Sequence, residues 1–177
     1  MHKFLAPLLI AIFFSAQSSA SAINVDQALS MPEAKVEASL ADSHPSVIYA
    51  YAKRLFESGH KSDAVFWFYV GQLRYRYHLI ANPTLPQDGE PALLAALNAT
   101  LGKAINEWAG GSPKAWAASI DKALAWDSAN PNATTPKDQN ARALEETRKG
   151  LTELRDLIVK NEDQIRTQRQ SSGLNVR

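Results

Sequence analysis

The sequence predicts an all-α fold of about five helices, arranged as an irregular bundle that ends in a long C-terminal helix. Apolar residues recur at spacings of three and four over most of the chain, which is the period of an amphipathic helix. Turns that contain proline or glycine separate these stretches. Alternation of apolar and polar residues, which favours a strand, occurs only in a segment that continues a helix without a turn.

The first 22 residues have the pattern of a cleavable signal peptide. Lys3 precedes the apolar run Phe4–Phe14, and the small residues Ala20-Ser21-Ala22 follow. The run is about half of the roughly 20 residues that cross the hydrocarbon core of a bilayer. We therefore expect cleavage after Ala22, export to the periplasm and no stable membrane anchor after cleavage.

Charge and cysteine content exclude several classes of function. Removal of the signal peptide removes Lys3 and no acidic residue, so the 18 acidic side chains are matched by an equal number of basic ones. A nucleic-acid-binding surface needs a clustered excess of lysine and arginine, so nucleic acid is not an expected partner. The chain has no cysteine, which excludes disulfides, thiolate catalysis and cysteine-ligated metals. An exported domain without cysteine is typical of a bacterial periplasmic protein.

The segment after the signal peptide, residues 23–43, has scattered charge and no strong apolar period. It is expected to form a loosely ordered arm, in which Pro32–Leu40 is the part most compatible with a short helix. A single α-helical domain then spans residues 44–169. Its first helix is predicted over Ser46–Ser58 and ends at Gly59, a residue suited to a left-handed C-terminal cap.

The second helix is predicted to follow Ser62-Asp63 and to end at Ala81, before Asn82-Pro83. Its first half, Ala64–Val70, is apolar on all sides, which indicates the buried centre of the domain. Residues 84–90 are expected to form an exposed loop.

The second half of the chain predicts three more helices and a frayed tail over residues 170–177. The helices are expected over Pro91–Trp108, Pro113–Ala129 and Pro136–Gln168. The last of them carries an apolar stripe of period seven: Leu144, Leu151, Ile158 and Ile165. Such a stripe can form a dimer seam, but polar Thr147 and Asn161 interrupt the complementary stripe and favour packing within the chain.

The first two predicted helices carry bulky and small residues in the order typical of a repeat hairpin: Ile48, Tyr51, Ala52, Leu55, Gly59, Ala64, Phe68 and Gly71. Residues 46–82 thereby resemble a tetratricopeptide or Sel1-like helical hairpin, and residues 111–131 form a weaker echo. Lys103 and Glu107 occupy places that the family keeps apolar. The resemblance implies helical-repeat packing and, at the level of the family, protein or peptide binding.

The densest candidate binding segment lies in the second half of the second helix. It interleaves planar cations with aromatic rings, a composition enriched at binding hot spots: Arg74, Tyr75, Arg76 and His78. In the alternative interpretation, the tyrosines pack inside and the arginines pair with carboxylates at the rim of the core. Trp108, Trp116 and Trp126 form a second candidate, as an aromatic platform or as part of the core.

Catalytic chemistry has no local signature in this sequence. The three histidines after the signal peptide are far apart along the chain, at His44, His60 and His78. The acidic candidates are likewise separated and meet only if the fold brings them together: Asp63, Glu107, Asp121 and Asp127. We therefore predict no catalytic residue, cofactor or metal site.

The sequence as a whole predicts an exported, non-enzymatic module that binds another protein. A periplasmic adaptor and an immunity-type inhibitor of an envelope toxin are the two forms that we expect. The alternatives are a cell-wall or glycan hydrolase, which needs converging carboxylates, and a structural oligomer built on the C-terminal helix.

Overall fold

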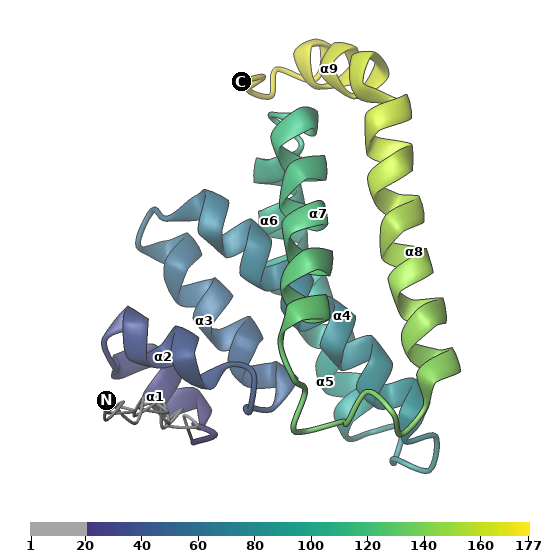
Figure 1. Cartoon of the computed structure of the whole chain (residues 1–177). Coiled ribbons are helices and arrows are strands. Elements are labelled where there is room, and N and C mark those ends of the chain that lie inside the picture. Colours follow the sequence, from purple (N-terminus) through teal and green to yellow (C-terminus); the bar gives the residue numbers. More distant parts are fainter. Residues whose placement is uncertain (1–20) are drawn as a thin grey trace, which may run out of the picture.

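The computed structural model describes residues 21–177, and the segment with the signal-peptide pattern lies almost entirely outside these residues. Helix makes up 73% of the structure and the described residues contain no strand, so the all-α prediction is confirmed. They form eight helices, rather than about five, when α5, η1 and α6 are counted as one continuous helix (Figure 1). The bounds are α1 Val25–Ser30, α2 Glu33–Ser39, α3 Pro45–Glu57, α4 Lys61–Ala81, α5 Glu90–Leu97, η1 Asn98–Gly102, α6 Lys103–Ala109, α7 Pro113–Ala129, α8 Ala141–Lys160 and α9 Glu162–Ser171.

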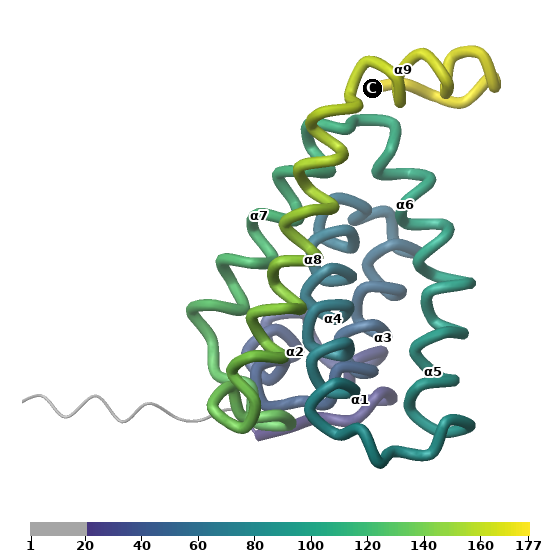
Figure 2. Tube along the Cα trace, turned by 90° about the vertical axis from the view of Figure 1, so that its right-hand side faces the viewer, coloured from purple at the N-terminus to yellow at the C-terminus, as the bar shows by residue number. Residues whose placement is uncertain are grey.

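Helix α4 is the centre of the molecule. Twelve of its 21 residues are buried, as the apolar run in its sequence predicts. Helix α3 packs along one side of it, and α7 and α8 pack along another (Figure 2). Helices α5 and α6 also contact α4. The other long helices, α3, α7 and α8, therefore all contact α4.

Helices α3 and α4 form the hairpin that the residue pattern predicts. Gly59 in the connecting turn has a φ of +92°, a conformation that glycine adopts without strain. A Cβ atom built on Gly71 lies 3.0 Å from Cδ2 of Tyr49. The two helices are therefore so close that a side chain at position 71 would fit only if the Tyr49 ring shifted by a few tenths of an ångström.

Residues 23–43 do not form the loosely ordered arm that was expected. They form the two short helices α1 and α2, the second of which coincides with the Pro32–Leu40 segment. Ala28, Val36 and Leu40 are fully buried, and Arg54 Nη1 donates to the carbonyl oxygens of Ala28 and Met31 at 3.2 and 2.6 Å. Each helix is too short to show an apolar period, and α1 is positioned by its contacts to α3.

The predicted third helix is confirmed in extent but interrupted in its middle. Residues 98–102 form a π-turn, η1, between α5 and α6. The Oδ1 atom of Asn98 accepts hydrogen bonds from the Tyr49 hydroxyl at 3.0 Å and from Gln72 Nε2 at 3.4 Å. The extra residue of the π-turn thus keeps a polar side chain directed at the core helices.

The predicted last helix is divided into α8 and α9. It breaks at Asn161, and it begins at Ala141 because the side chain of Asn140 caps it, accepting from the amide of Ala143 at 3.0 Å. Three residues of the period-seven stripe are buried within the chain, where α8 packs on α7 (Figure 1): Leu144, Leu151 and Ile158.

The tail also departs from expectation. The amide of Arg177 donates to Gly111 at 2.6 Å, and its guanidinium lies 3.8 Å from the centre of the Trp108 ring. Residues 172–177 therefore return to the turn between α6 and α7. Among the helices of residues 21–177, none combines the length and apolar character needed to cross a membrane.

Candidate functional site

Arg74, the first residue of the predicted binding segment, is fully buried. Its Nε lies 3.1 Å from Oδ1 of Asp127, and its Nη1 donates to the carbonyl oxygen of Ala41 at 3.0 Å. The guanidinium lies 4.6 Å from the centre of the Trp126 ring. Burial lowers the pKa of Arg74 and the Asp127 carboxylate opposes this effect. The side chain joins α4 to α7 and to the loop after α2, so it is not presented to a partner.

Asp127 is the centre of this buried charge network. Its Oδ2 accepts from Nη2 of Arg148 on α8 at 2.6 Å, and its side chain is 1% exposed. One carboxylate thus meets two guanidinium groups. The remaining acidic candidates do not join it: Asp63 and Glu107 are exposed, and Asp121 pairs with Arg155 at 3.1 Å.

The other three residues of the predicted segment separate. Tyr75 is buried and its hydroxyl donates to Glu90, Arg76 is exposed, and His78 is half-buried. The structure does not bring the four residues to one surface. The tyrosines follow the alternative interpretation, since Tyr75 and Tyr77 are both fully buried, but Arg74 pairs inside the core rather than at its rim.

The three tryptophans are engaged within the chain. Trp116 Nε1 donates to the Tyr69 hydroxyl at 2.7 Å, and Trp126 packs edge-on against Trp67 with ring centres 5.1 Å apart. Trp108 lies under Arg177. All three are partly buried and pack against the core, which agrees with the core interpretation rather than with an open platform.

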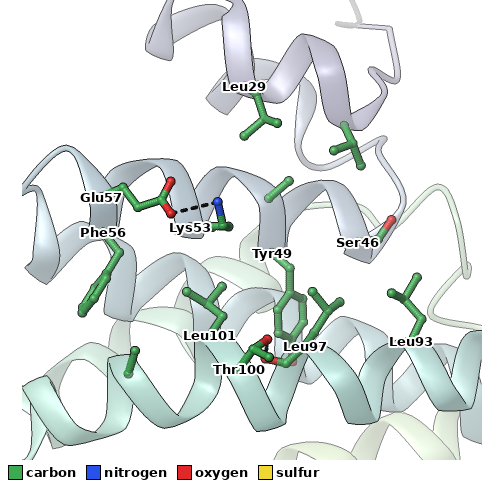
Figure 3. A pocket seen from close by; sticks show the side chains of 13 residues that line it. Leu29, Ser46, Tyr49, Lys53, Phe56, Glu57, Leu93, Leu97, Thr100 and Leu101 are labelled. Carbon is green, nitrogen blue, oxygen red and sulfur yellow. Dashed lines mark hydrogen bonds and ion pairs between the residues drawn. The ribbon is translucent and has the colours of Figure 1, made fainter.

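An apolar groove lies elsewhere, on the outer face of α3, and sequence analysis did not identify it. Its volume is about 730 Å³. Helix α1 forms one wall, α3 the floor, and the α5–η1–α6 helix the other wall (Figure 3). A volume of about 300–1,000 Å³ with mostly apolar lining is typical of binding sites.

The walls of the groove carry aliphatic side chains without a partner in the described structure. Val25 and Leu29 on α1 are 39% and 45% exposed, and Leu93 on α5 is 43% exposed. Leu97 and Leu101 continue the second wall (Figure 3). Two helices thus present apolar rows across a floor that a third helix provides.

Polar groups mark the two ends of the groove. At one end Lys53 Nζ pairs with Glu57 Oε1 at 2.8 Å, and Ser46 lies at the opposite end (Figure 3). Thr100, from the π-turn, lies between them. π-turns occur often at functional sites because they change the direction of side chains within a helix, and this one places Thr100 and Leu101 in the wall.

Two histidines that are far apart in the sequence lie close together in the structure. His44, at the start of α3, and His78, on α4, have ring centres 5.4 Å apart. His60 stays apart from them, exposed and 3.7 Å from Glu33. The approach of His44 to His78 joins positions 34 residues apart in sequence, so no local motif indicates it.

Comparisons of the chain with protein-family models, with curated proteins and with solved structures found no match. The likeness of residues 46–82 to a tetratricopeptide or Sel1-like hairpin therefore stays a prediction from the residue pattern.

Proposed function

We propose that the protein is an exported, non-enzymatic binding protein that holds an apolar helical segment of another protein in the groove on α3. The observation that carries this proposal is the groove itself, with exposed aliphatic side chains on both walls. Exposed apolar residues gathered at one place on a surface are typical of interaction sites.

The shape of the groove favours a helix as the occupant. Two helical walls flank a helical floor, so a further helix laid between the walls would pack as neighbouring helices do, with axes about 8–10 Å apart. An amphipathic helix offers apolar side chains at spacings of three, four and seven, which match walls made of leucines one turn apart. Leu93, Leu97 and Leu101 have this spacing.

The polar ends of the groove support the same occupant. Lys53 and Glu57 lie at one end and Ser46 at the other, and these groups can pair with the polar flanks of an amphipathic helix. A free acyl chain carries a polar group at one end only, whereas this groove has polar groups at both ends. We therefore favour a protein partner over a lipid.

Export to the periplasm belongs to this proposal, because it rests on the signal-peptide pattern of the first 22 residues. In that compartment a small helical binder would act as an adaptor or as an immunity-type inhibitor of an envelope toxin. In the inhibitor form, the bound helix would belong to the toxin.

The test combines capture with site-directed crosslinking. A photoreactive phenylalanine analogue replaces Leu93, the protein is illuminated in native envelope extract, and the crosslinked peptide is sequenced. The proposal expects a single partner, crosslinked through an amphipathic helical segment. A crosslink to lipid, or to no molecule, would contradict it.

Matched variants then locate the contact with the identified partner. Leu29→Asp with Leu93→Asp places charge on both walls, and we expect binding at least about 100-fold weaker, because buried charge without a partner is costly. Leu157→Asp is the control, since Leu157 is 55% exposed on α8, outside the groove lining. Equal loss in both variants, or no loss in the double variant, would exclude the groove as the binding site.

A further inference from the structure

Three potential metal ligands meet beside the groove. His44, His78 and Glu90 each offer one ligand atom, and the three atoms lie within 4.8 Å of one another. They come from the N-terminal end of α3, from α4 and from the first turn of α5. All three side chains are only partly buried, so an ion has a path to them from solvent.

The separation of the ligand atoms fits coordination of one ion. The Nε2 atom of His44 lies 3.4 Å from Oε2 of Glu90. Two ligands of a tetrahedral zinc ion, each at about 2.0–2.1 Å from the metal, lie about 3.3–3.4 Å apart. This pair therefore already has the spacing of two ligands, and the ligand atom of His78 lies within 4.8 Å of both.

Hydrogen bonds with neighbouring hydroxyl groups fix the orientation of each ligand. Nδ1 of His44 lies 2.8 Å from Ser46 Oγ, and Nδ1 of His78 lies 2.7 Å from Thr135 Oγ1. Nδ1 of His44 also accepts from the Ser46 amide at 3.2 Å, and Nδ1 of His78 lies 3.3 Å from Nδ2 of Asn82. An accepting Nδ1 places the proton of the neutral ring on Nε2. Binding of an ion at Nε2 therefore requires this proton to move to Nδ1, where the Ser46 and Thr135 hydroxyl groups can accept a hydrogen bond from it. The Tyr75 hydroxyl donates to Glu90. Protein metal sites commonly have such supporting hydrogen bonds to their ligands.

The ionisation of the cluster is compatible with metal binding. Burial lowers the pKa of His44, and Glu90 opposes this effect. Burial and the neighbouring His44 lower the pKa of His78. Both imidazoles therefore favour the neutral form, which is the form that binds metal.

We propose that His44, His78 and Glu90 bind one divalent transition-metal ion, with zinc as the ion that the ligands fit best. Two imidazoles and one carboxylate suit zinc and its neighbours in the first transition row rather than calcium or magnesium, which take oxygen ligands. Three protein ligands leave a fourth position for water or for another donor.

The proposed ion would stiffen one end of the groove. Ser46, the hydrogen-bond partner of His44, lines the groove, and Leu93 lies one helical turn after Glu90. The ion would tie the start of α5 to α3 and α4, and so fix the spacing of floor and wall. The metal site does not depend on the identity of the partner, and it stands or falls separately from the proposed function.

Zinc titration of the untagged protein, after removal of metal with a chelator, is the direct test. Isothermal titration calorimetry is expected to give one zinc ion per chain. Glu90→Gln keeps the shape of the side chain and an acceptor for Tyr75, and we expect it to weaken zinc binding at least about 10-fold, as loss of a ligand should exceed the loss of a supporting group. His78→Ala is expected to do the same.

His60→Ala is the matched control, because His60 also lies near a carboxylate but has no third ligand beside it in the described structure. It should leave the zinc affinity unchanged. Cobalt supplies a second readout: visible absorption bands of low-coordinate cobalt should form in the wild-type protein and in His60→Ala, and be much weaker in Glu90→Gln at the same cobalt concentration.

Three results would overturn the proposal: no zinc binding by the wild-type protein, unchanged affinity in Glu90→Gln and His78→Ala, or equal loss in His60→Ala. Circular dichroism of each variant checks that it is folded. Because Glu90→Gln changes the side chain least, it decides the question if His78→Ala proves to be unfolded.

Discussion

The environment of Arg74 is determined by residues far from it in sequence. Its carboxylate partner, Asp127, is 53 positions away, and the carbonyl group of Ala41 is 33 positions away. Isolated buried charges are costly, whereas paired and hydrogen-bonded ones persist. Composition near Arg74 is that of a binding surface, and only the tertiary partners show that this arginine belongs to the core.

Loss of the Asp127 charge is expected to destabilise the protein strongly. In Asp127→Asn, the guanidinium groups of Arg74 and Arg148 lose their shared carboxylate, and breaking a buried pair costs about 3–5 kcal/mol. Urea unfolding followed by circular dichroism measures the effect.

The control for this prediction is Asp121→Asn, which removes an exposed partner of Arg155. Such surface pairs contribute about 0–1 kcal/mol. Similar losses of stability in the two variants would show that the Asp127 network is not a stabilising centre.

At the scale of helices, alanine substitution is expected to have opposite effects on stability at two glycines that lie within helices. At Gly71, an added Cβ atom would lie 3.0 Å from the ring of Tyr49, whereas at Gly150, in the middle of α8, it would have nothing within 4 Å. In Gly71→Ala, the helix-propensity gain of about 1 kcal/mol is opposed by an overpacking cost of about 1–3 kcal/mol. We expect a net loss of stability.

Gly150→Ala should instead raise stability by up to about 1 kcal/mol, because the position is exposed and only propensity changes. Thermal unfolding of the two variants beside the wild type measures both effects. If Gly71→Ala were also stabilising, α3 and α4 would be less closely packed than the structure describes.

Helix α1, one wall of the groove, is held by a side chain of the floor helix. Arg54 donates to the carbonyl oxygens of Ala28 and Met31 at the end of α1, and hydrogen bonds from charged donors contribute about 1.5–3 kcal/mol. In Arg54→Ala we expect the amides of residues 25–30 to exchange with solvent about 10-fold faster or more. Amide hydrogen exchange measures this directly.

Lys53→Ala is the control for α1, since Lys53 precedes Arg54 on the same helix and pairs only with exposed Glu57 in the described structure. It should leave the exchange of residues 25–30 unchanged. Equal exchange in Arg54→Ala and wild type would mean that apolar contacts alone hold α1 in place.

At the scale of the whole molecule, the sequence predicts α3, α4 and α7 well, joins α8 and α9 into one helix, and gives no indication of the groove. The bounds of α7 match the prediction, and those of α3 and α4 differ from it by one to three residues, because each has a strong apolar pattern between clear turns. The groove needs α1, α3 and α5 together. Its wall residues Leu29 and Leu93 lie on short helices whose position only tertiary contacts define.

The cluster of His44, His78 and Glu90 also depends on tertiary contacts rather than on local sequence. His44 and His78 are separated by a complete helix, and Glu90 follows a loop. None of the three lies at a spacing that is typical of metal-ligand motifs. Their meeting depends on how α3, α4 and α5 converge, which no local signal reports.

The buried position of Arg74 also has a consequence for the order of folding. Helices α3 and α4 are neighbours along the chain, so their hairpin can form early at little cost in loop closure. The guanidinium of Arg74, however, stays hydrated until the segments around Ala41 and Asp127 have both arrived. The charge can therefore leave water only once α7 has docked, so segments outside the hairpin complete the burial of α4.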